Sequence, residues 1–137
     1  MPWDDDPMTE AIIGCAIEVH RALGPGLLES TYPQCMAHEL SLRGRRFGMQ
    51  VPIPVLYKGL SLDCTYKADL IVENDVIVEL KSVETVTGVH QAQLLTYLKL
   101  TGVRVGLLIN FNVRRLADGV TRLRHQRTTV GSGATSR

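Results

Sequence analysis

The sequence has few aromatic residues, few cysteines and no long apolar run, and each absence excludes a class of protein. Aromatic residues make up 5% of the 137 positions, so the core must be built mainly from Leu, Ile and Val. The three cysteines, Cys15, Cys35 and Cys64, are odd in number and widely spaced, with no C-x-x-C pair and no zinc-type Cys/His cluster. This pattern argues against a disulfide framework or a zinc site, and we expect reduced, mostly buried cysteines.

The sequence also lacks the segments that direct a chain to or across a membrane. No apolar run approaches the ~20 residues that cross a bilayer. The N-terminus, MPWDDDPMTE, is acidic and does not have the layout of a secretory signal. We therefore expect a cytoplasmic protein with no membrane partner. With 45% hydrophobic and 21% charged residues, the chain is predicted to form a single domain at 1–124, followed by a disordered tail at 125–137.

Charge is distributed unevenly although the formal net charge is only +1. Residues 1–103 contain 8 Lys or Arg and 13 Asp or Glu, whereas residues 104–137 contain 7 Arg and a single Asp. This asymmetry indicates separate places for a cation and a polyanion. A solvated, Arg-rich edge strand and tail is an equally good interpretation.

Two helices are predicted in the first third of the chain. Asp6 followed by a proline is typical of a helix N-terminus, and apolar residues then recur at helical spacing across 7–23. A Gly-Pro-Gly sequence ends this helix. A second helical segment is predicted at 27–43, in which Pro33 must either lie near the first turn or kink the helix.

Twofold alternation replaces helical spacing after residue 50. It predicts strands at 51–57, 60–72 and 76–83, which tight turns join into an antiparallel meander. Pro52 and Pro54 confine the first strand to a sheet edge. The remaining elements are a helix and two strands, at 87–101, 103–110 and 119–124. The order ααβββαββ describes an α/β domain with a mixed central sheet flanked by helices.

Three charged side chains are predicted to meet where two of these strands pair. Glu79 and Lys81 are two residues apart in one strand, so both project from the same face. The tight turn that follows the preceding strand places Asp69 opposite Glu79 or Leu80. Two carboxylates about 5 Å apart repel each other, and a hard divalent cation relieves the repulsion. An ordinary cross-strand salt bridge is the alternative, with similar weight.

These residues resemble a known nuclease core. Ala68-Asp69, followed ten residues later by Glu79-Leu80-Lys81, is similar to the motif of the PD-(D/E)xK nuclease superfamily, in which Ala68 stands in place of the nominal proline. The sequence Gly26-x-x-Glu29-x-x-Tyr32 resembles the signature of the GxxExxY family, a small branch of that superfamily. Three further segments fit the family pattern, at 17–21, 66–70 and 107–111. The resemblance covers about residues 10–124 and implies a nuclease-like mixed sheet flanked by helices.

The resemblance also implies roles for individual residues. Asp69 and Glu79 would hold Mg²⁺ or Mn²⁺, and Lys81 would be the catalytic lysine. Glu29, expected on a helix, matches the extra acidic residue that many superfamily members direct at the metal. A solvated helix carboxylate is its alternative.

Two further groups are candidates for binding the substrate. Gln93 and Tyr97 form a Q-x-x-x-Y pattern similar to that of RecB-type exonucleases, and their spacing places them on one helix face. They would orient a metal ligand or contact the DNA backbone, or else form a buried hydrogen-bonded pair. Arg122 and Arg124 share one face of the last strand, where they would follow a phosphate backbone or lie on a solvated edge.

Three functions are compatible with these residues. The first is a Mg²⁺-dependent nuclease that hydrolyses DNA phosphodiester bonds. The second is a nuclease-fold module for nucleic-acid binding or assembly without turnover, and the third is a metal-dependent enzyme that acts on small phosphoesters. Nucleic acid, most simply DNA, is the expected partner. Because no second recognition domain is evident, a homodimer or a protein partner is expected as well.

Overall fold

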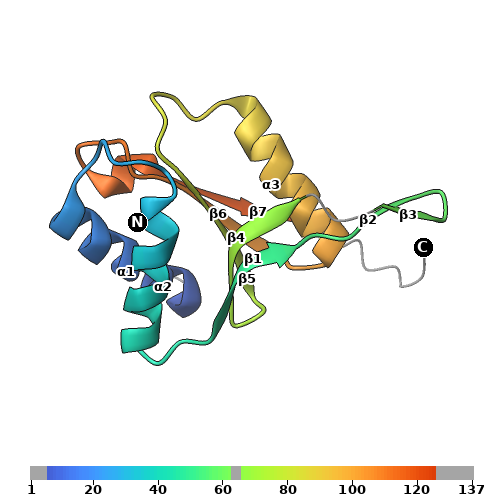
Figure 1. Ribbon diagram of the computed structural model, residues 1–137, viewed down its shortest axis with the longest axis horizontal. Helices are drawn as coiled ribbons and strands as arrows, with labels where there is room; N and C mark the ends of the chain where they lie inside the picture. Colours follow the sequence, from blue (N-terminus) through green and yellow to red (C-terminus); the bar gives the residue numbers. More distant parts are fainter. Residues whose placement is uncertain (1–5, 63–65, 126–137) are drawn as a thin grey trace.

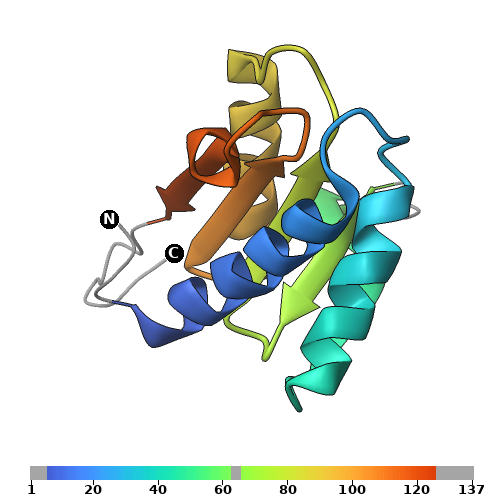
Figure 2. The same ribbon diagram turned by 90° about the vertical axis from the view of Figure 1, so that its left-hand side faces the viewer.

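The computed structural model of the protein describes residues 6–62 and 66–125, whose helices and strands are arranged in three layers (Figure 1). In chain order these elements are α1 (Pro7–Leu23), α2 (Thr31–Leu42), β1 (Phe47–Pro52), β2 (Val55–Tyr57), β3 (Leu60–Leu62), β4 (Lys67–Val72), β5 (Val76–Lys81), α3 (Gly88–Thr101), β6 (Val105–Asn110), the short 3-10 helix η1 (Leu116–Gly119) and β7 (Val120–Arg124). Helices α1 and α2 cover one face of the central sheet (Figure 2), and α3 covers the other.

Helix α1 forms as its sequence predicts. The side chain of Asp6 accepts a hydrogen bond from the Met8 backbone at 3.2 Å and thereby satisfies one of the free N–H groups of the first turn. The proline at the next position has no N–H to satisfy there. Gly24 ends the helix at the expected place.

Helix α2 begins later than predicted, at Thr31 instead of residue 27. Its proline lies in the first turn, where it removes no helical hydrogen bond, so the helix is not kinked there. Glu29 consequently lies in the turn before the helix and not on the helix itself. This corrects the expected setting of Glu29 and frees its side chain to reach the end of the sheet.

The central sheet has five strands in the order β1-β4-β5-β6-β7. Strands β5 and β6 are parallel and are connected through α3, whereas the other neighbours are antiparallel. The sheet is therefore mixed and flanked by helices, as predicted. The strand that contains Pro52 lies at one edge and β7 lies at the other, which also agrees with the sequence.

The predicted meander is present, but two of its strands are interrupted. The segment predicted at 51–57 splits into the end of β1 and β2, and the segment at 60–72 splits into β3 and β4. Strands β2 and β3 pair only with each other and extend from the body of the molecule as a hairpin, here called the arm (residues 55–62; Figure 1). The twofold alternation of the sequence is the same in the sheet and in the arm, so it does not reveal the break.

The two faces of the sheet bury separate apolar clusters. Residues of β5 with even numbers, such as Val78 and Leu80, pack with α1 and α2. On the opposite face, Ile77 packs with Leu94 and Leu98 of α3. Because side chains alternate along a strand, Glu79 and Lys81 belong to the α3 face.

Other predictions concern the cysteines and the chain end. Cys15 is buried and Cys35 is half-buried, and both are free thiols. Cys64 and the tail predicted at 125–137 lie outside the described residues, except for His125. Within the described part of the chain, no helix combines the length and the apolar character needed to span a bilayer.

Gly119, the last residue of η1, lies in close contact with neighbouring backbone. A Cβ atom at Gly119 would overlap the backbone oxygen of Asn110, whereas one at Gly88 would meet nothing within 4 Å. We expect Gly119→Ala to lower the free energy of unfolding by about 1–3 kcal/mol, because backbone must move to accept the methyl group. Gly88→Ala, the matched control, should leave stability unchanged or raise it slightly. Urea unfolding followed by circular dichroism measures both, and equal stabilities would refute the close approach.

Candidate active site at the end of strand β5

Two carboxylates join strands β4 and β5 where the regular pairing ends. The register runs from Val72 opposite Val76 to Leu70 opposite Val78, which places Asp69 opposite Glu79. There the side chains replace the backbone ladder. The Asp69 N–H donates to Oε2 of Glu79 at 2.8 Å, and the Leu80 N–H donates to Oδ2 of Asp69 at 2.8 Å. The predicted approach of the two acids is therefore present, with one oxygen of each bound to the other strand.

Burial makes this pair of negative charges unfavourable. Glu79 is only 5% exposed. Burial, followed by the charge of Asp69, raises its pKa to about 7 against the hydrogen bond from the Asp69 backbone. Burial likewise raises the pKa of Asp69, although the Leu80 N–H and the charge of Lys81 act in the other direction. A cation between the two acids would relieve this cost.

Gln50 is a third contact of the pair, and the sequence did not predict it. It lies in β1 at the register position opposite Asp69, and its side chain lowers the pKa of that carboxyl group. Its φ of 50° is in the left-handed region, which is uncommon for a residue other than glycine inside a strand. Backbone strain of this kind is concentrated at functional sites. No local feature of the sequence marks Gln50, because the pairing of β1 with β4 is what brings it to Asp69.

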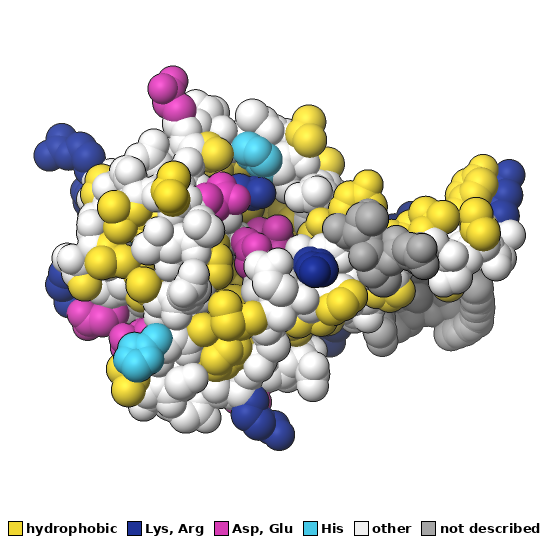
Figure 3. Space-filling view, viewed as in Figure 1, with side chains coloured by type: hydrophobic (Ala, Val, Ile, Leu, Met, Phe, Trp, Pro, Cys, Tyr) yellow, Lys and Arg dark blue, Asp and Glu magenta, His cyan; other side chains and the backbone are white. Residues whose placement is uncertain are grey.

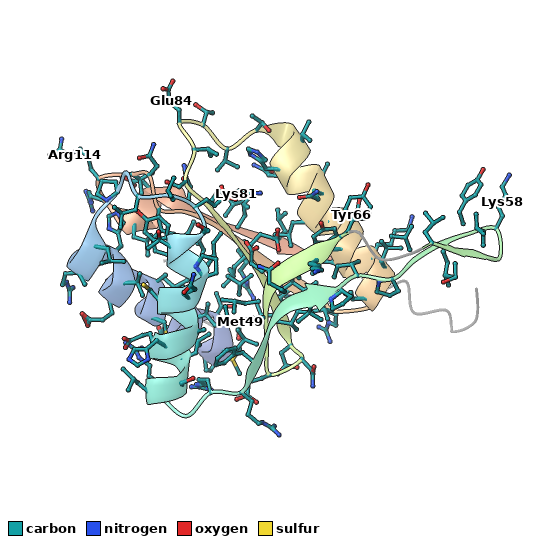
Figure 4. The ribbon with its side chains drawn as sticks, in the orientation of Figure 1. Met49, Lys58, Tyr66, Lys81, Glu84 and Arg114 are labelled. Carbon is teal, nitrogen blue, oxygen red and sulfur yellow. The ribbon has the colours of Figure 1, made fainter. Side chains whose placement is uncertain are left out.

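Lys81 lies at the end of β5 beside Glu29. Its Nζ is 4.0 Å from Oε2 of Glu29, and its side chain is 17% exposed. The other carboxylate oxygen of Glu29 accepts the Ser82 N–H at 3.1 Å. Glu29 is close enough for its charge to raise the pKa of both Asp69 and Glu79. The structure thus brings all four predicted residues into one region (Figure 4 labels Lys81), and Figure 3 shows acidic side chains grouped near the centre of this face.

The motif around Glu29 has a structural basis. Tyr32 is fully buried, and its ring stacks on Phe111 with centroids 4.3 Å apart. Its hydroxyl donates to the Gly24 carbonyl at 2.9 Å and accepts the Leu27 N–H at 3.2 Å, so it holds both ends of the turn before Glu29. Gly26 has a φ of 93°, which a residue with a Cβ rarely adopts. Gly26 and Tyr32 therefore hold the turn in the conformation that lets Glu29 contact the Ser82 N–H at the end of β5.

Helix α3 packs on the sheet face that carries Glu79 and contributes Tyr97 to the site. Tyr97 is 5% exposed, and burial together with the nearby charges of Glu79 and Asp69 raises its pKa. Gln93 is half-buried one turn earlier on the same helical face. His90, one turn before it, closes a capping box with Thr87 and so serves the helix N-terminus. Tyr97 is thus at the site, and Gln93 shares its face.

Asn110 is a second residue to which the sequence assigned no role. It is 4% exposed at the end of β6, where its side chain accepts the Val83 N–H at 3.1 Å and donates to the Val83 carbonyl at 2.9 Å. These bonds fix the segment that follows Lys81. The only signal in the sequence is its position inside the 107–111 segment that fits the family pattern.

The two arginines predicted to follow a phosphate backbone are not brought to the carboxylates. Arg122 pairs in register with Leu107 and Arg124 with Val105, so both lie on the face covered by α1. Glu79 pairs with Leu108 and faces α3. Arg122 also forms an ion pair with Asp6 at 3.0 Å. The sheet itself separates these arginines from the acidic pair.

The carboxylate oxygens of Asp69 and Glu79 suit a hard cation that takes few of its ligands from the protein. Asp69 and Glu79 offer carboxylate oxygens only, and Glu79 is nearly buried with a raised pKa. Among the described residues, no group of three or more His, Cys, Asp or Glu side chains gathers as a metal site. Mg²⁺ is commonly held by one or two carboxylates, with water and phosphate oxygens completing its shell. The pair therefore fits Mg²⁺ or Mn²⁺ and does not fit a structural zinc site.

Comparison with known proteins agrees with this geometry. Residues 6–123 match the family model described as PD-(D/E)XK nuclease superfamily, a span that includes every helix and nearly every strand residue described above. No curated protein and no solved structure matches the chain significantly.

The raised pKa of Glu79 predicts how stability depends on pH. Between the ordinary carboxyl value of 4.5 and about 7, the folded state binds more protons at Glu79 than the unfolded state does. The free energy of unfolding should therefore fall by up to about 3 kcal/mol as pH rises through this window in the absence of metal. Glu79→Gln should remove most of this loss, because the amide keeps an acceptor oxygen but does not ionise.

Urea unfolding at pH 5 and pH 8 in EDTA measures this difference. Glu84→Gln is the matched control, because Glu84 is exposed in the loop between β5 and α3 (Figure 4). This variant should lose as much stability between pH 5 and pH 8 as the wild-type protein does. The same loss in Glu79→Gln and in the wild-type protein would contradict the raised pKa.

Proposed function

Because the chain belongs to the PD-(D/E)XK nuclease superfamily, we propose that it is a nuclease that hydrolyses DNA phosphodiester bonds with a divalent cation. We place it in the GxxExxY branch on the basis of Gly26, Glu29 and Tyr32. The observation that carries the proposal is the junction of β4 and β5, where Asp69 and Glu79 exchange hydrogen bonds beside Lys81. Nucleases of this superfamily typically use divalent metals.

Asp69 and Glu79 are the proposed metal ligands. One oxygen of each acid is bound to a backbone N–H, which fixes the carboxylates and leaves their other oxygens for the cation. A bound Mg²⁺ or Mn²⁺ would supply Lewis-acid polarisation of the phosphate and lower the pKa of a bound water. Burial of Glu79 excludes water from one side of the pair and strengthens electrostatic interactions there.

Lys81 is the proposed catalytic lysine. Its ammonium group lies on the same strand face as Glu79, where it can stabilise the negative charge that develops on the phosphate oxygens. Glu29 is proposed to position Lys81 and the Ser82 backbone and to add negative charge near the cation. This role differs from the direct ligand role that the sequence suggested, because both of its oxygens already have partners.

Tyr97 and Gln93 are proposed to line the substrate side of the site. Tyr97 lies close enough to the acids for their charges to raise its pKa, and Gln93 precedes it on the same helix face. Their proposed task is to orient a metal ligand or to contact the DNA backbone. Arg122 and Arg124 are not part of the proposed substrate surface, because they lie on the other face of the sheet.

Replacement of Lys81 tests the proposed mechanism directly. We expect Lys81→Ala to lower the cleavage rate of labelled DNA in Mg²⁺ or Mn²⁺ by at least about 100-fold, because its charge acts in the transition state. Binding of metal and of DNA should change little. Lys99→Ala, at an exposed position of α3, should cut at the wild-type rate.

The same assay separates the proposal from its alternatives. Cleavage by Lys81→Ala at the wild-type rate would assign the lysine to a structural ion pair with Glu29. Binding of DNA by the wild-type protein without any cleavage would favour a nuclease-fold binding module. Cleavage of nucleotides but not of plasmid would favour an enzyme of small phosphoesters.

Metal binding is the second test. We expect calorimetry to detect one Mn²⁺ ion per chain, and Asp69→Asn to weaken its affinity by about tenfold or more, since one of two charged ligands is lost. Affinity should rise with pH up to about 7, because the cation competes with the proton that Glu79 then carries. If titration with Mn²⁺ released or absorbed no heat of binding, both with and without DNA, the proposed metal site would be contradicted.

A further inference from the structure

The arm leaves apolar side chains uncovered where it extends from the body of the molecule (Figure 1). Tyr57 is 61% exposed and Leu60, its partner in the hairpin, is 57% exposed. Leu56 and Leu62 of the arm are exposed as well. In Figure 3 the arm is mainly hydrophobic, with a basic residue at its tip, and Figure 4 identifies that residue as Lys58. An isolated two-stranded hairpin is only marginally stable in water, so a contact on this surface would stabilise it.

The base of the arm is connected to the acidic pair through two tyrosines. Tyr66 is 48% exposed, and its ring meets that of Tyr97 edge to face, with centroids 6.4 Å apart. Tyr97 in turn lies beside Glu79 and Asp69. An exposed aromatic ring is therefore one ring away from the proposed cleavage centre.

Charge on this side of the molecule does not suit a duplex. Among the described residues of the arm and of β4, only Lys58 and Lys67 are cations. Arg46 is paired with Glu73, and Arg122 is paired with Asp6 on the other face of the sheet. Duplex binding depends mainly on phosphate contacts from basic residues. Single-stranded nucleic acid is held by aromatic rings on which its bases stack, together with basic side chains that follow its backbone.

We propose that Tyr66 and the arm bind the unpaired bases of a single DNA strand and direct that strand to the acidic pair. This inference rests on the proposed nuclease function and specifies its substrate as DNA with a single-stranded segment. The Ile53 N–H donates to the Tyr66 carbonyl at 2.9 Å, and Tyr57 lies four residues further along the same extended segment. That separation is about 13 Å, or about four stacked bases at ~3.4 Å.

Fluorescence anisotropy with Ca²⁺ in place of Mg²⁺ tests the proposal without relying on cleavage. The probes are fluorescein-labelled dT20 and a 20-base-pair duplex. We expect tighter binding of dT20, with a log–log salt slope no steeper than about −1.4 from two lysine contacts. Tyr66→Ala should weaken dT20 binding at least fivefold, about the lower limit for loss of one stacked base. Tyr66→Phe should retain binding, because it keeps the ring.

A matched pair of variants tests the arm. Leu60→Ser on the arm should weaken dT20 binding, whereas Leu42→Ser, at a leucine of α2 that is at least as exposed, should not. Equal affinity of the wild-type protein for both probes would overturn the proposal, and so would wild-type affinity of Tyr66→Ala for dT20. A dimer that Leu60→Ser dissociates with no change in dT20 binding would assign the arm to a second copy of the chain and overturn its role here.

These outcomes differ from those that would refute the nuclease function. Lys81-dependent cleavage of duplex, with no effect of Tyr66→Ala on binding or on cleavage, would retain the nuclease and reject this inference. Binding of dT20 that depends on Tyr66, with no cleavage in Mg²⁺ or Mn²⁺, would retain the inference about binding and reject the nuclease.

Discussion

The candidate site depends on an exchange of hydrogen bonds between β4 and β5. Up to Leu70 and Val78 the two strands pair through their backbones, and beyond that point the side chains of Asp69 and Glu79 take over. This exchange lets β4 turn away toward the arm while β5 continues beside β6. It also satisfies two backbone N–H groups that would otherwise lie unpaired in a partly buried region. Asp69 and Glu79 thus join the two strands and are also the proposed metal ligands, and the sheet sets their positions.

The charges of the molecule are organised by face and not by position in the chain. The acidic first part and the basic last part of the sequence indicated separate sites for a cation and a polyanion. In the structure, Arg122 lies against Asp6, and Arg43 lies against Glu39 four residues earlier on α2. Arg122 of the basic last part therefore neutralises an acid of the first part, whereas Arg43 neutralises an acid within the first part itself. Among the residues that the structure describes, Lys81 is the positive charge that acts on the acidic pair, at the place where the proposed phosphate would bind.

Local signals predicted much of the fold and of the site. The cap at Asp6 located the first helix, and the turn after β4 gave the register that brings Asp69 opposite Glu79. Both depend on residues close together in sequence. The start of α2 was misplaced because the buried hydroxyl of Tyr32 holds the turn before it, and the helical spacing of apolar residues does not show this contact.

Tertiary information explains the other differences. Spacing by two correctly put Arg122 and Arg124 on one face, but only their pairing with β6 shows which face that is. Gln50 reaches Asp69 through a pairing between distant segments, so its neighbours in the sequence give no sign of it. Apolar alternation likewise does not distinguish a strand inside the sheet from one in the arm.

The ion pair between Asp6 and Arg122 joins residues that are 116 positions apart. Asp6 caps the first helix, and Arg122 lies in the last strand of the sheet. During synthesis, α1 leaves the ribosome long before β7 does. Part of the apolar face of α1 therefore stays uncovered until β7 has been synthesised. The domain is therefore closed late, by its final strand, and a nascent chain that stalls before Arg122 would expose that face to chaperones or to aggregation.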